Sequence, residues 1–343
     1  MDHLLVTQLT VTHFTRRPAP GAFSIERVFN DLRASLPAWV TVRVAQNAYL
    51  SRGILPRLRD AWAARNQQSQ VNHIVGDVHY LAMFLPRSRT VLTVHDTLFL
   101  ERERGMKRFL LWLFWLWLPT RRSARITTIS EESRRRLMLL VTIDPALIEV
   151  IPNPVGTGFS QRPMPERRGP FRLLHLGAKA NKNLERLVPA LDGLGIELTV
   201  IGRLSQAQAT MLEHHLPKAY RCRSDLDEAE LQAEYARAEA TVFVSLSEGF
   251  GLPILEAQAT GRPVLTSARA PMSEIAGEGA LLVDPEDGTA IREAVSRLVT
   301  EPSLRDDLIA RGNENLSRFS TEIIANRYAA LYASVAREAG PDA

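Results

Sequence analysis

The 343 residues exceed what one ordinary hydrophobic core contains, so we expect two domains. Apolar content of 45% and charged content of 23% are typical of a globular protein, and the single cysteine, Cys222, excludes an intrachain disulfide framework. The net charge of +4 divides into +9 for residues 1–160 and −5 for residues 161–343, which favours an anionic partner for the front half only. No nucleic-acid-binding motif accompanies this charge, which argues against a nucleic-acid partner.

Residues 4–12 alternate apolar and polar side chains, as a first strand does. The preceding residues have no basic region followed by a long apolar region, so no signal peptide is expected and the protein is predicted to be cytoplasmic. A loop at 16–21 ends in Gly21 and leads into a predicted helix over residues 23–36. A dinucleotide-binding G-x-G-x-x-G pattern is absent there.

Strands are predicted at 40–45, 71–75 and 90–94, and residues 52–65 are typical of a polar, basic helix. The third of these strands is followed by His95 and Asp96, and the second by Asp77 and His79. Site residues of α/β domains gather at the carboxyl ends of parallel strands. A histidine at a strand end can equally be a hydrogen-bonded scaffold residue, and that alternative stays open for His79.

Residues 109–118 are ten consecutive apolar residues that include three tryptophans, with basic residues on both sides. A helix that spans a membrane needs about twenty apolar residues. The run therefore predicts either contact with an anionic membrane surface or a helix buried against the first domain.

A strand at 126–130 precedes a charged helix for which Ser130 is a predicted N-cap. Glycine and proline mark residues 156–170 as a linker. The second domain begins with a strand at 171–176, followed by Gly177, Lys179 and Lys182 at a strand-to-helix turn. Lysine and backbone amides at such a turn suit a diphosphate.

The next strand, 197–202, ends in Gly202. Asp225 and Asp227 match the D-x-D pattern of metal-dependent sugar transferases, but they precede an amphipathic helix for which an aspartate N-cap is the better interpretation. No other cluster has the spacing of metal ligands, so no metal site is predicted.

The most informative stretch follows a predicted strand at 240–245. Glu248 stands in a glycine-bearing loop and Glu256 stands about two turns into the helix behind it, before a strand at 263–267. Ionised carboxylates accept hydrogen bonds from sugar hydroxyls. Glycines in the loop allow close approach of the backbone, and the helix start favours anionic oxygens.

The segment Glu248-Gly-Phe-Gly-Leu-Pro-Ile-Leu-Glu256 resembles the signature of retaining glycosyltransferases of family 4, which have the GT-B fold. The resemblance implies an α/β fold of two Rossmann-like domains, with an acceptor domain at 1–160 and a nucleotide-sugar donor domain at 161–318. It also implies that a C-terminal helix within 319–343 packs back on the first domain. Ala178 stands where the family has an arginine, and Lys179 is a candidate replacement.

The resemblance assigns residues to three roles. The implied catalytic residues are His95, Lys182 and Glu248. The implied donor-binding residues are Gly177, Lys179, Lys182, Gly202, Glu248, Gly249, Phe250, Gly251, Leu252 and Glu256. The implied acceptor-binding residues are Gly21 and His95, and Asp77, His79 and Asp96 are added to them as candidates because they follow strands at the expected carboxyl edge.

The function implied is retaining, metal-independent transfer of a hexose from a GDP- or UDP-sugar to a glycan or a polyprenyl- or other lipid-linked acceptor in cell-envelope assembly. The nucleotide sugar is a substrate, and no cofactor is expected. The charge of the front half and the apolar, tryptophan-containing run at 109–118 together predict a peripheral position at the inner face of the plasma membrane. Two alternatives remain: another GT-B reaction, namely sugar-nucleotide epimerisation or phosphorolysis, and a membrane-bound carbohydrate-binding scaffold whose site has lost activity at Ala178.

Overall fold

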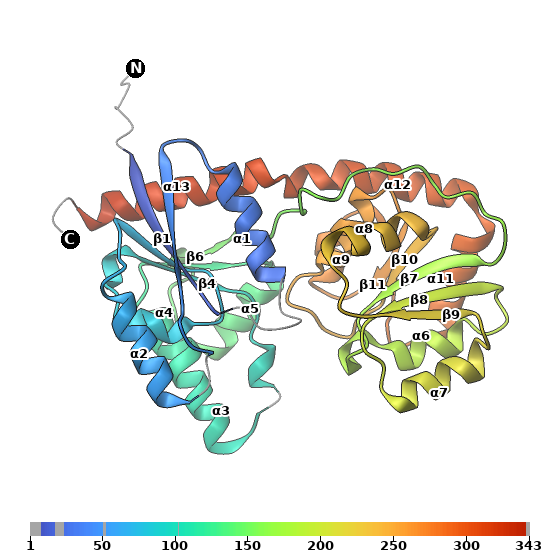
Figure 1. Cartoon of the computed structure of the whole chain (residues 1–343), viewed down its shortest axis with the longest axis horizontal. Coiled ribbons are helices and arrows are strands. Elements are labelled where there is room, and N and C mark those ends of the chain that lie inside the picture. Colours follow the sequence, from blue (N-terminus) through green and yellow to red (C-terminus); the bar gives the residue numbers. More distant parts are fainter. Residues whose placement is uncertain (1–7, 18–23, 51–52, 102, 341–343) are drawn as a thin grey trace. The chain divides into compact units, whose positions relative to one another are not determined.

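A computed structural model describes residues 8–17, 24–50, 53–101 and 103–340. The chain divides into two compact units, one formed by residues 1–154 with 321–343 and the other by residues 155–320. Each unit contains a parallel six-stranded sheet with helices on both faces, which is the predicted α/β architecture of two Rossmann-like domains (Figure 1).

The first unit has the strand order β2-β1-β3-β4-β5-β6. Its strands are β1 Leu9–Thr15, β2 Val40–Gln46, β3 Val71–Ile74, β4 Thr90–Val94, β5 Arg125–Thr128 and β6 Ile148–Val150. Its helices are α1 Ser24–Ser35, α2 Ile54–Ala64, α3 Gly105–Leu111, α4 Leu118–Arg121, α5 Glu131–Leu140 and α13 Thr321–Ala339. Helices α1 and α13 contact each other on one face of the sheet, and α2 to α5 lie on the other (Figure 1).

The second unit has the strand order β12-β11-β10-β7-β8-β9. Its strands are β7 Phe171–Leu176, β8 Ile196–Ile201, β9 Tyr220–Arg223, β10 Ala240–Phe243, β11 Val264–Ser267 and β12 Ala280–Val283. Its helices are α6 Leu184–Ala190, α7 Gln206–His215, α8 Glu228–Arg237, α9 Leu252–Ala259, α10 Met272–Ala276, α11 Gly288–Thr300 and α12 Pro302–Leu316.

The predicted strands agree with the structure to within a few residues, except at the front of the chain. The first strand occupies residues 9–15 rather than 4–12, and residues 1–7 lie outside the described part. Interior strands such as β4 are buried at every position, because helices cover both faces of a parallel sheet. The prediction of Ser130 as N-cap of α5 is confirmed, since its side chain accepts a hydrogen bond from the amide of Ser133.

The tryptophan-rich run forms a π-helical segment, Trp112–Trp117, between α3 and α4. Trp112 donates its indole N–H to the carbonyl of Leu140 over 2.8 Å, and Trp115 donates to the carbonyl of Asp77 over 3.3 Å. All three tryptophans are partly buried and pack against the core of the first unit. The structure therefore packs the tryptophans against the first unit, while Phe109 and Leu110 at the start of the run are exposed, and membrane contact of this region stays a prediction. Among the described residues, no helix is both long enough and apolar enough to cross a bilayer.

Helix α13 follows the second unit in sequence but belongs to the first unit in space. It is held there by a buried polar cluster in which the hydroxyl of Tyr332 lies 3.0 Å from Nε2 of His13 and 2.7 Å from Nδ1 of His73. Nε2 of His73 in turn lies 2.7 Å from the hydroxyl of Thr93. Burial and the neighbouring Arg33 guanidinium lower the pKa of His13 from 6.5 to about 3, so this imidazole is neutral in the folded protein.

We predict that acidification destabilises the first unit through this cluster. Below pH 6.5 the unfolded chain protonates His13 whereas the folded chain does not, so the unfolded state binds more protons and stability falls as pH decreases toward 3. The expected loss is about 1.4 kcal/mol per pH unit for each such histidine. Thermal unfolding of wild type and His13→Gln between pH 7 and pH 4.5 measures it. An equally steep pH dependence in the variant would show that His13 is not responsible.

Candidate active site

The candidate donor site lies in the second unit, at the carboxyl ends of β7 and β10. The chain leaves β10, passes through Glu248 and enters α9 at Gly251. Gly251 has φ +116°, and a Cβ added there would lie 3.2 Å from Cδ1 of Ile254, so this helix start favours glycine. The positive end of the α9 dipole points toward the loop and favours anionic groups there.

Glu248 is held by two residues of the turn that follows β7. Nζ of Lys182 donates to its Oε1 over 2.7 Å, and Nδ2 of Asn181 donates to the same oxygen over 3.2 Å. Asn181 also donates to the carbonyl of Ser247 over 3.0 Å, so it fixes both the backbone and the side chain of this loop. The Lys182 ammonium lies 4.5 Å from the centroid of the Phe243 ring. The Lys182–Glu248 pair is mostly buried, with 19% and 15% of the two side chains exposed.

Gly177 makes room for this arrangement. Its φ is +98°, and a Cβ added at this position would lie 2.7 Å from Cγ of Lys182. The aliphatic part of Lys182 therefore folds directly over the glycine, which directs its ammonium toward Glu248. The sequence predicted a glycine and a lysine together at this turn. The structure shows why a glycine is favoured there: the Lys182 side chain approaches the Gly177 backbone closely.

Glu256 lies in the body of α9 and is almost fully buried. The hydroxyl of Tyr235, on α8, donates to its Oε2 over 2.8 Å. Tyr235 was not predicted from the sequence, because its partner is 21 residues away and nothing in the local pattern distinguishes it from other core aromatics.

The other predicted donor-binding residues have varied surroundings. The Lys179 side chain is exposed, and Gly202 at φ +152° lets the end of β8 approach the amide of Ala178, since a Cβ would lie 3.1 Å from that nitrogen. The ring of Phe250 is buried 6.1 Å from the ring of Phe319. Phe250 therefore anchors the loop to the core.

The D-x-D residues are engaged in local structure. Asp227 caps α8, with its side chain accepting from the amide of Glu230. Asp225 pairs with Arg203 over 2.9 Å, and this guanidinium keeps the pKa of Asp225 below its usual value. Among the described residues, no group of three or more His, Cys, Asp or Glu side chains is arranged to hold a metal ion.

The candidate acceptor residues lie in the first unit, along the carboxyl edge of its sheet. His95 follows β4 and is buried, and its Nε2 lies 2.9 Å from the carbonyl of Val75 at the end of the neighbouring β3. Because a carbonyl only accepts, Nε2 carries the proton. Nδ1 is therefore the ring nitrogen that can accept a hydrogen bond.

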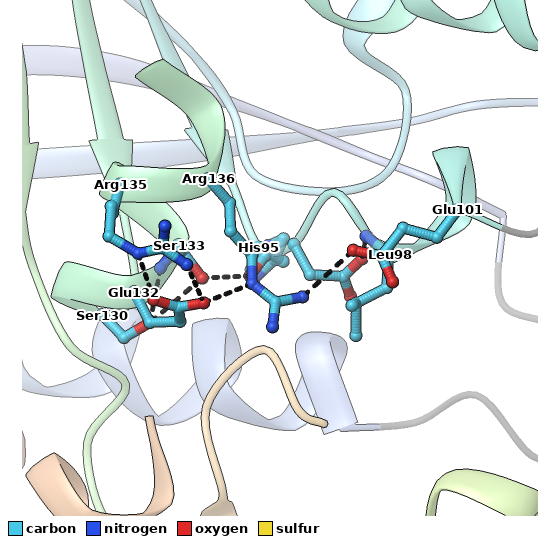
Figure 2. A network of polar contacts seen from close by, with 9 residues as sticks. His95, Leu98, Glu101, Ser130, Glu132, Ser133, Arg135 and Arg136 are labelled. Carbon is cyan, nitrogen blue, oxygen red and sulfur yellow. Dashed lines mark hydrogen bonds and ion pairs between the residues drawn. The ribbon is translucent and has the colours of Figure 1, made fainter. Parts of the chain in front are cut away.

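The backbone of His95 is fixed from the other side by the start of α5. Ser133 donates to the carbonyl of His95 over 3.2 Å (Figure 2). Next to Ser133 in the chain, the Glu132 carboxylate accepts hydrogen bonds from Arg135 over 2.7 Å and from Arg136 over 2.5 Å. Arg136 also forms an ion pair with Glu101 (Figure 2). The two arginines lower the pKa of Glu132, so this carboxylate stays ionised.

Three predicted acceptor residues have identified partners. Asp77 pairs with Arg16 over 2.9 Å, and Arg16 also holds Glu26 over 2.7 Å. Asp96 accepts from the amide of Leu98 over 3.0 Å. His79 is buried, with Nδ1 2.6 Å from the carbonyl of Trp115, and burial lowers its pKa. Nδ1 thus makes a scaffold contact, and acceptor binding by His79 stays a prediction, whereas Gly21 lies outside the described residues.

Arg16 is a second residue that the sequence analysis missed. It lines a pocket at the carboxyl ends of β1 and β3, together with residues that include Glu26, Asn30, Arg33 and Gly76. Apolar residues that include Ile25, Phe29 and Val75 line it as well. Its position next to Asp77 makes it a candidate for acceptor contact. The residues that line this pocket come together only when the sheet folds, so their spacing in the sequence does not predict the pocket.

Comparison with known proteins identifies the family. The family model described as "Glycosyltransferase Family 4" matches residues 8–159, and the model described as "Glycosyl transferases group 1" matches residues 163–315. The chain belongs to these glycosyltransferases. The predicted resemblance is therefore confirmed in both halves of the chain.

Two relatives and one solved structure illustrate the match. The chain is 27% identical over 244 residues to the O-antigen chain mannosyltransferase RfbU of Salmonella typhimurium, covering 68% of this chain and 66% of that protein. It is 30% identical over 176 residues to the GDP-mannose:cellobiosyl-diphosphopolyprenol alpha-mannosyltransferase of Komagataeibacter xylinus, covering 50% and 43%. The matched segments span less than two thirds of either relative.

Anabaena HepE, solved with UDP and glucose, superposes with a TM-score of 0.75 at 15% identity and covers 95% of this chain and 100% of that chain. At this identity the likeness shows the fold alone. The glycosyltransferase is thus a GT-B protein, as the sequence predicted.

We predict that Glu256→Ala weakens binding of the nucleotide part of the donor. Loss of a charged acceptor for a ribose hydroxyl costs about 1.5–3 kcal/mol, or roughly a 10- to 150-fold increase in Kd measured by calorimetry. Glu256→Gln keeps an acceptor for Tyr235 but loses the charge, and is expected to fall between wild type and Glu256→Ala.

Glu293→Ala on the surface of α11 is the matched control and should bind as wild type does. If Glu256→Ala binds the nucleotide with wild-type affinity, Glu256 is not a donor-binding residue.

Proposed function

We propose that this glycosyltransferase moves a hexose from a GDP- or UDP-sugar to a glycan or lipid-linked acceptor, with retention at the anomeric carbon and without a metal ion. The observation that carries the proposal is the Lys182–Glu248 pair, fixed by Asn181 beside the start of α9. The Lys182 ammonium can bind a diphosphate, and the adjacent Glu248 carboxylate can accept hydrogen bonds from the sugar hydroxyls.

The chemistry requires charge stabilisation at the leaving group. As the bond between the anomeric carbon and the diphosphate oxygen breaks, negative charge develops on the diphosphate, and a preorganised ammonium and backbone amides stabilise it. Lys182 supplies the ammonium, and the backbone of Gly249 to Leu252 together with the α9 dipole supplies the amides. Glu248 then accepts hydrogen bonds from the sugar, and Glu256 from the ribose.

In the first unit, we assign acceptor binding to His95. Its ring is held by the Val75 carbonyl and its backbone by Ser133, which leaves Nδ1 to accept a hydrogen bond from an acceptor hydroxyl. Among the described residues of the donor site, none is an evident nucleophile for double displacement, and we propose front-face transfer in which the leaving phosphate takes the acceptor proton.

The type of acceptor and the location follow from the relatives and from charge. The names of the two relatives refer to O-antigen chains and to a diphosphopolyprenol. We propose an acceptor of this kind, a growing cell-envelope saccharide on a lipid, at the cytoplasmic face of the membrane. The +9 charge of residues 1–160 suits that anionic surface.

The test is a transfer assay with GDP- and UDP-hexoses and a membrane extract that contains polyprenyl-diphosphate-linked saccharides. A preceding thermal-shift screen selects the donor, because a ligand at one hundred times its Kd stabilises the fold by about 2.7 kcal/mol. Proton NMR of the product should show the anomeric configuration of the donor. An epimerised or phosphorolysed sugar formed without acceptor would favour the other GT-B reactions, and nucleotide binding without any turnover would favour an inactive scaffold.

We predict that the same transfer continues in EDTA at an undiminished rate. Lys182 and the amides at the α9 start replace a divalent cation at the diphosphate, and the D-x-D aspartates are occupied by Arg203 and by capping of α8. Complete loss of turnover in chelator, with recovery on addition of Mn²⁺ or Mg²⁺, would contradict this prediction and would make Asp225 a candidate metal ligand.

A further inference from the structure

Helix α2 in the first unit presents an apolar stripe to solvent. Ile54, Leu58 and Trp62 are four residues apart and Leu55 lies beside them, so all four occupy one face of the helix. Between 46% and 77% of each residue is exposed. The opposite face, which includes Ala61 and Ala64, is buried against the core. The sequence predicted a polar, basic helix here, and the apolar stripe is a correction to that prediction.

Helix α3 presents a second apolar face. Met106, Phe109 and Leu110 follow the i, i+3, i+4 spacing of a single helix face and are between 45% and 70% exposed. The chain continues from α3 directly into the Trp112–Trp117 segment, and the Phe109 ring lies 5.8 Å from that of Trp112. The exposed apolar residues of this region therefore lie on α3, before the first tryptophan, and Phe109 and Leu110 belong to the predicted apolar run itself.

The two helices belong to one continuous part of the unit. The guanidinium of Arg57, on α2, stacks 4.5 Å above the ring of Trp115, in the segment that continues α3. Both helices lie on the face of the sheet opposite to α1 and α13 (Figure 1). We refer to the exposed residues of α2 and α3 together as the α2–α3 surface: Ile54, Leu55, Leu58, Trp62, Met106, Phe109 and Leu110.

The charges around the α2–α3 surface are predominantly positive. Residues 53–65 and 103–111 contain six basic and two acidic residues. One of the acidic residues, Asp60, is buried and accepts from the amide of Ala48, and the other, Glu103, pairs with Lys107. Arg59, Arg65, Arg104 and Arg108 are exposed. An exposed apolar face bordered by arginine is the pattern that binds an anionic lipid surface, since apolar side chains enter the acyl boundary and arginines meet the headgroups.

We propose that the α2–α3 surface docks the first unit on an anionic lipid bilayer. Two partly buried tryptophans contact this region, Trp112 through Phe109 and Trp115 through Arg57. The inference deepens the proposed transfer to a lipid-linked acceptor and rests on it for its biological meaning, but binding to lipid is measurable without any transfer.

The experiment is co-sedimentation of the full-length protein with vesicles of phosphatidylcholine alone or mixed with phosphatidylglycerol. Wild type is expected to bind the anionic vesicles at low salt and to be released by high salt. Leu55→Ser, Leu58→Ser, Trp62→Ser together should lower binding about tenfold or more, because the apolar stripe of α2 is removed. Arg59→Gln, Arg65→Gln, Arg108→Gln together should lower it about a hundredfold.

Matched controls keep the result interpretable. All substituted positions are exposed, so the thermal unfolding midpoint should stay within a few degrees of wild type. Leu282→Ser, an exposed apolar residue in β12 of the second unit, should bind vesicles as wild type does. Transfer to a soluble acceptor analogue should be unchanged in the surface variants, so failure of the transfer proposal and failure of the docking proposal give different results.

Three outcomes would overturn the proposal. Wild type that ignores anionic vesicles at low salt contradicts it directly. Equal vesicle binding by wild type and the α2 triple variant would place lipid contact elsewhere. Concentration-dependent self-association that the triple variant abolishes, without vesicle binding, would make the α2–α3 surface an interface between copies of the chain.

Discussion

The candidate donor site depends on one ion pair, between Nζ of Lys182 and Oε1 of Glu248 at 2.7 Å. A mostly buried ion pair gains little net stability, since desolvation offsets much of its attraction. The role of this pair is to hold both side chains in a fixed orientation. Gly177 provides the space beneath Lys182, Asn181 fixes the loop of Glu248, and the start of α9 adds its dipole. A diphosphate that enters this site meets an ammonium already oriented by a neighbouring carboxylate, so little reorganisation is needed at the moment of reaction.

The two units use comparable means to fix their site residues. In the second unit, Glu256 is oriented by the hydroxyl of Tyr235. In the first, His95 is held between the end of β3 and the start of α5, and α13 is attached by the buried cluster of His13, His73 and Tyr332. Each of these contacts joins elements far apart in sequence at the carboxyl edge or the face of a parallel sheet. Site residues therefore stand on rigid elements and on short loops braced by them.

Much of the fold was predictable because its signals are local. Buried parallel strands are continuous apolar runs, and the Glu248-to-Glu256 segment combines loop, glycine and helix within nine residues. The partners of these residues were not predictable, since Asn181, Tyr235 and Arg16 lie 67, 21 and 61 residues from the carboxylates that they hold. The tryptophan run also shows the limit of composition. Ten apolar residues indicate burial or lipid contact equally well, and only packing showed that the tryptophans face the core while neighbouring residues on α2 and α3 face solvent.

The most direct test of the account compares nucleoside diphosphate with nucleoside monophosphate binding, by calorimetry, in wild type and Lys182→Ala. If Lys182 holds the diphosphate, wild type should prefer the diphosphate and the variant should lose about 1.5–3 kcal/mol of that preference, with little change for the monophosphate. Lys218→Gln, which removes an exposed positive charge elsewhere in the second unit, should behave as wild type does. An undiminished preference for the diphosphate in Lys182→Ala would contradict the proposed role of the Lys182–Glu248 pair.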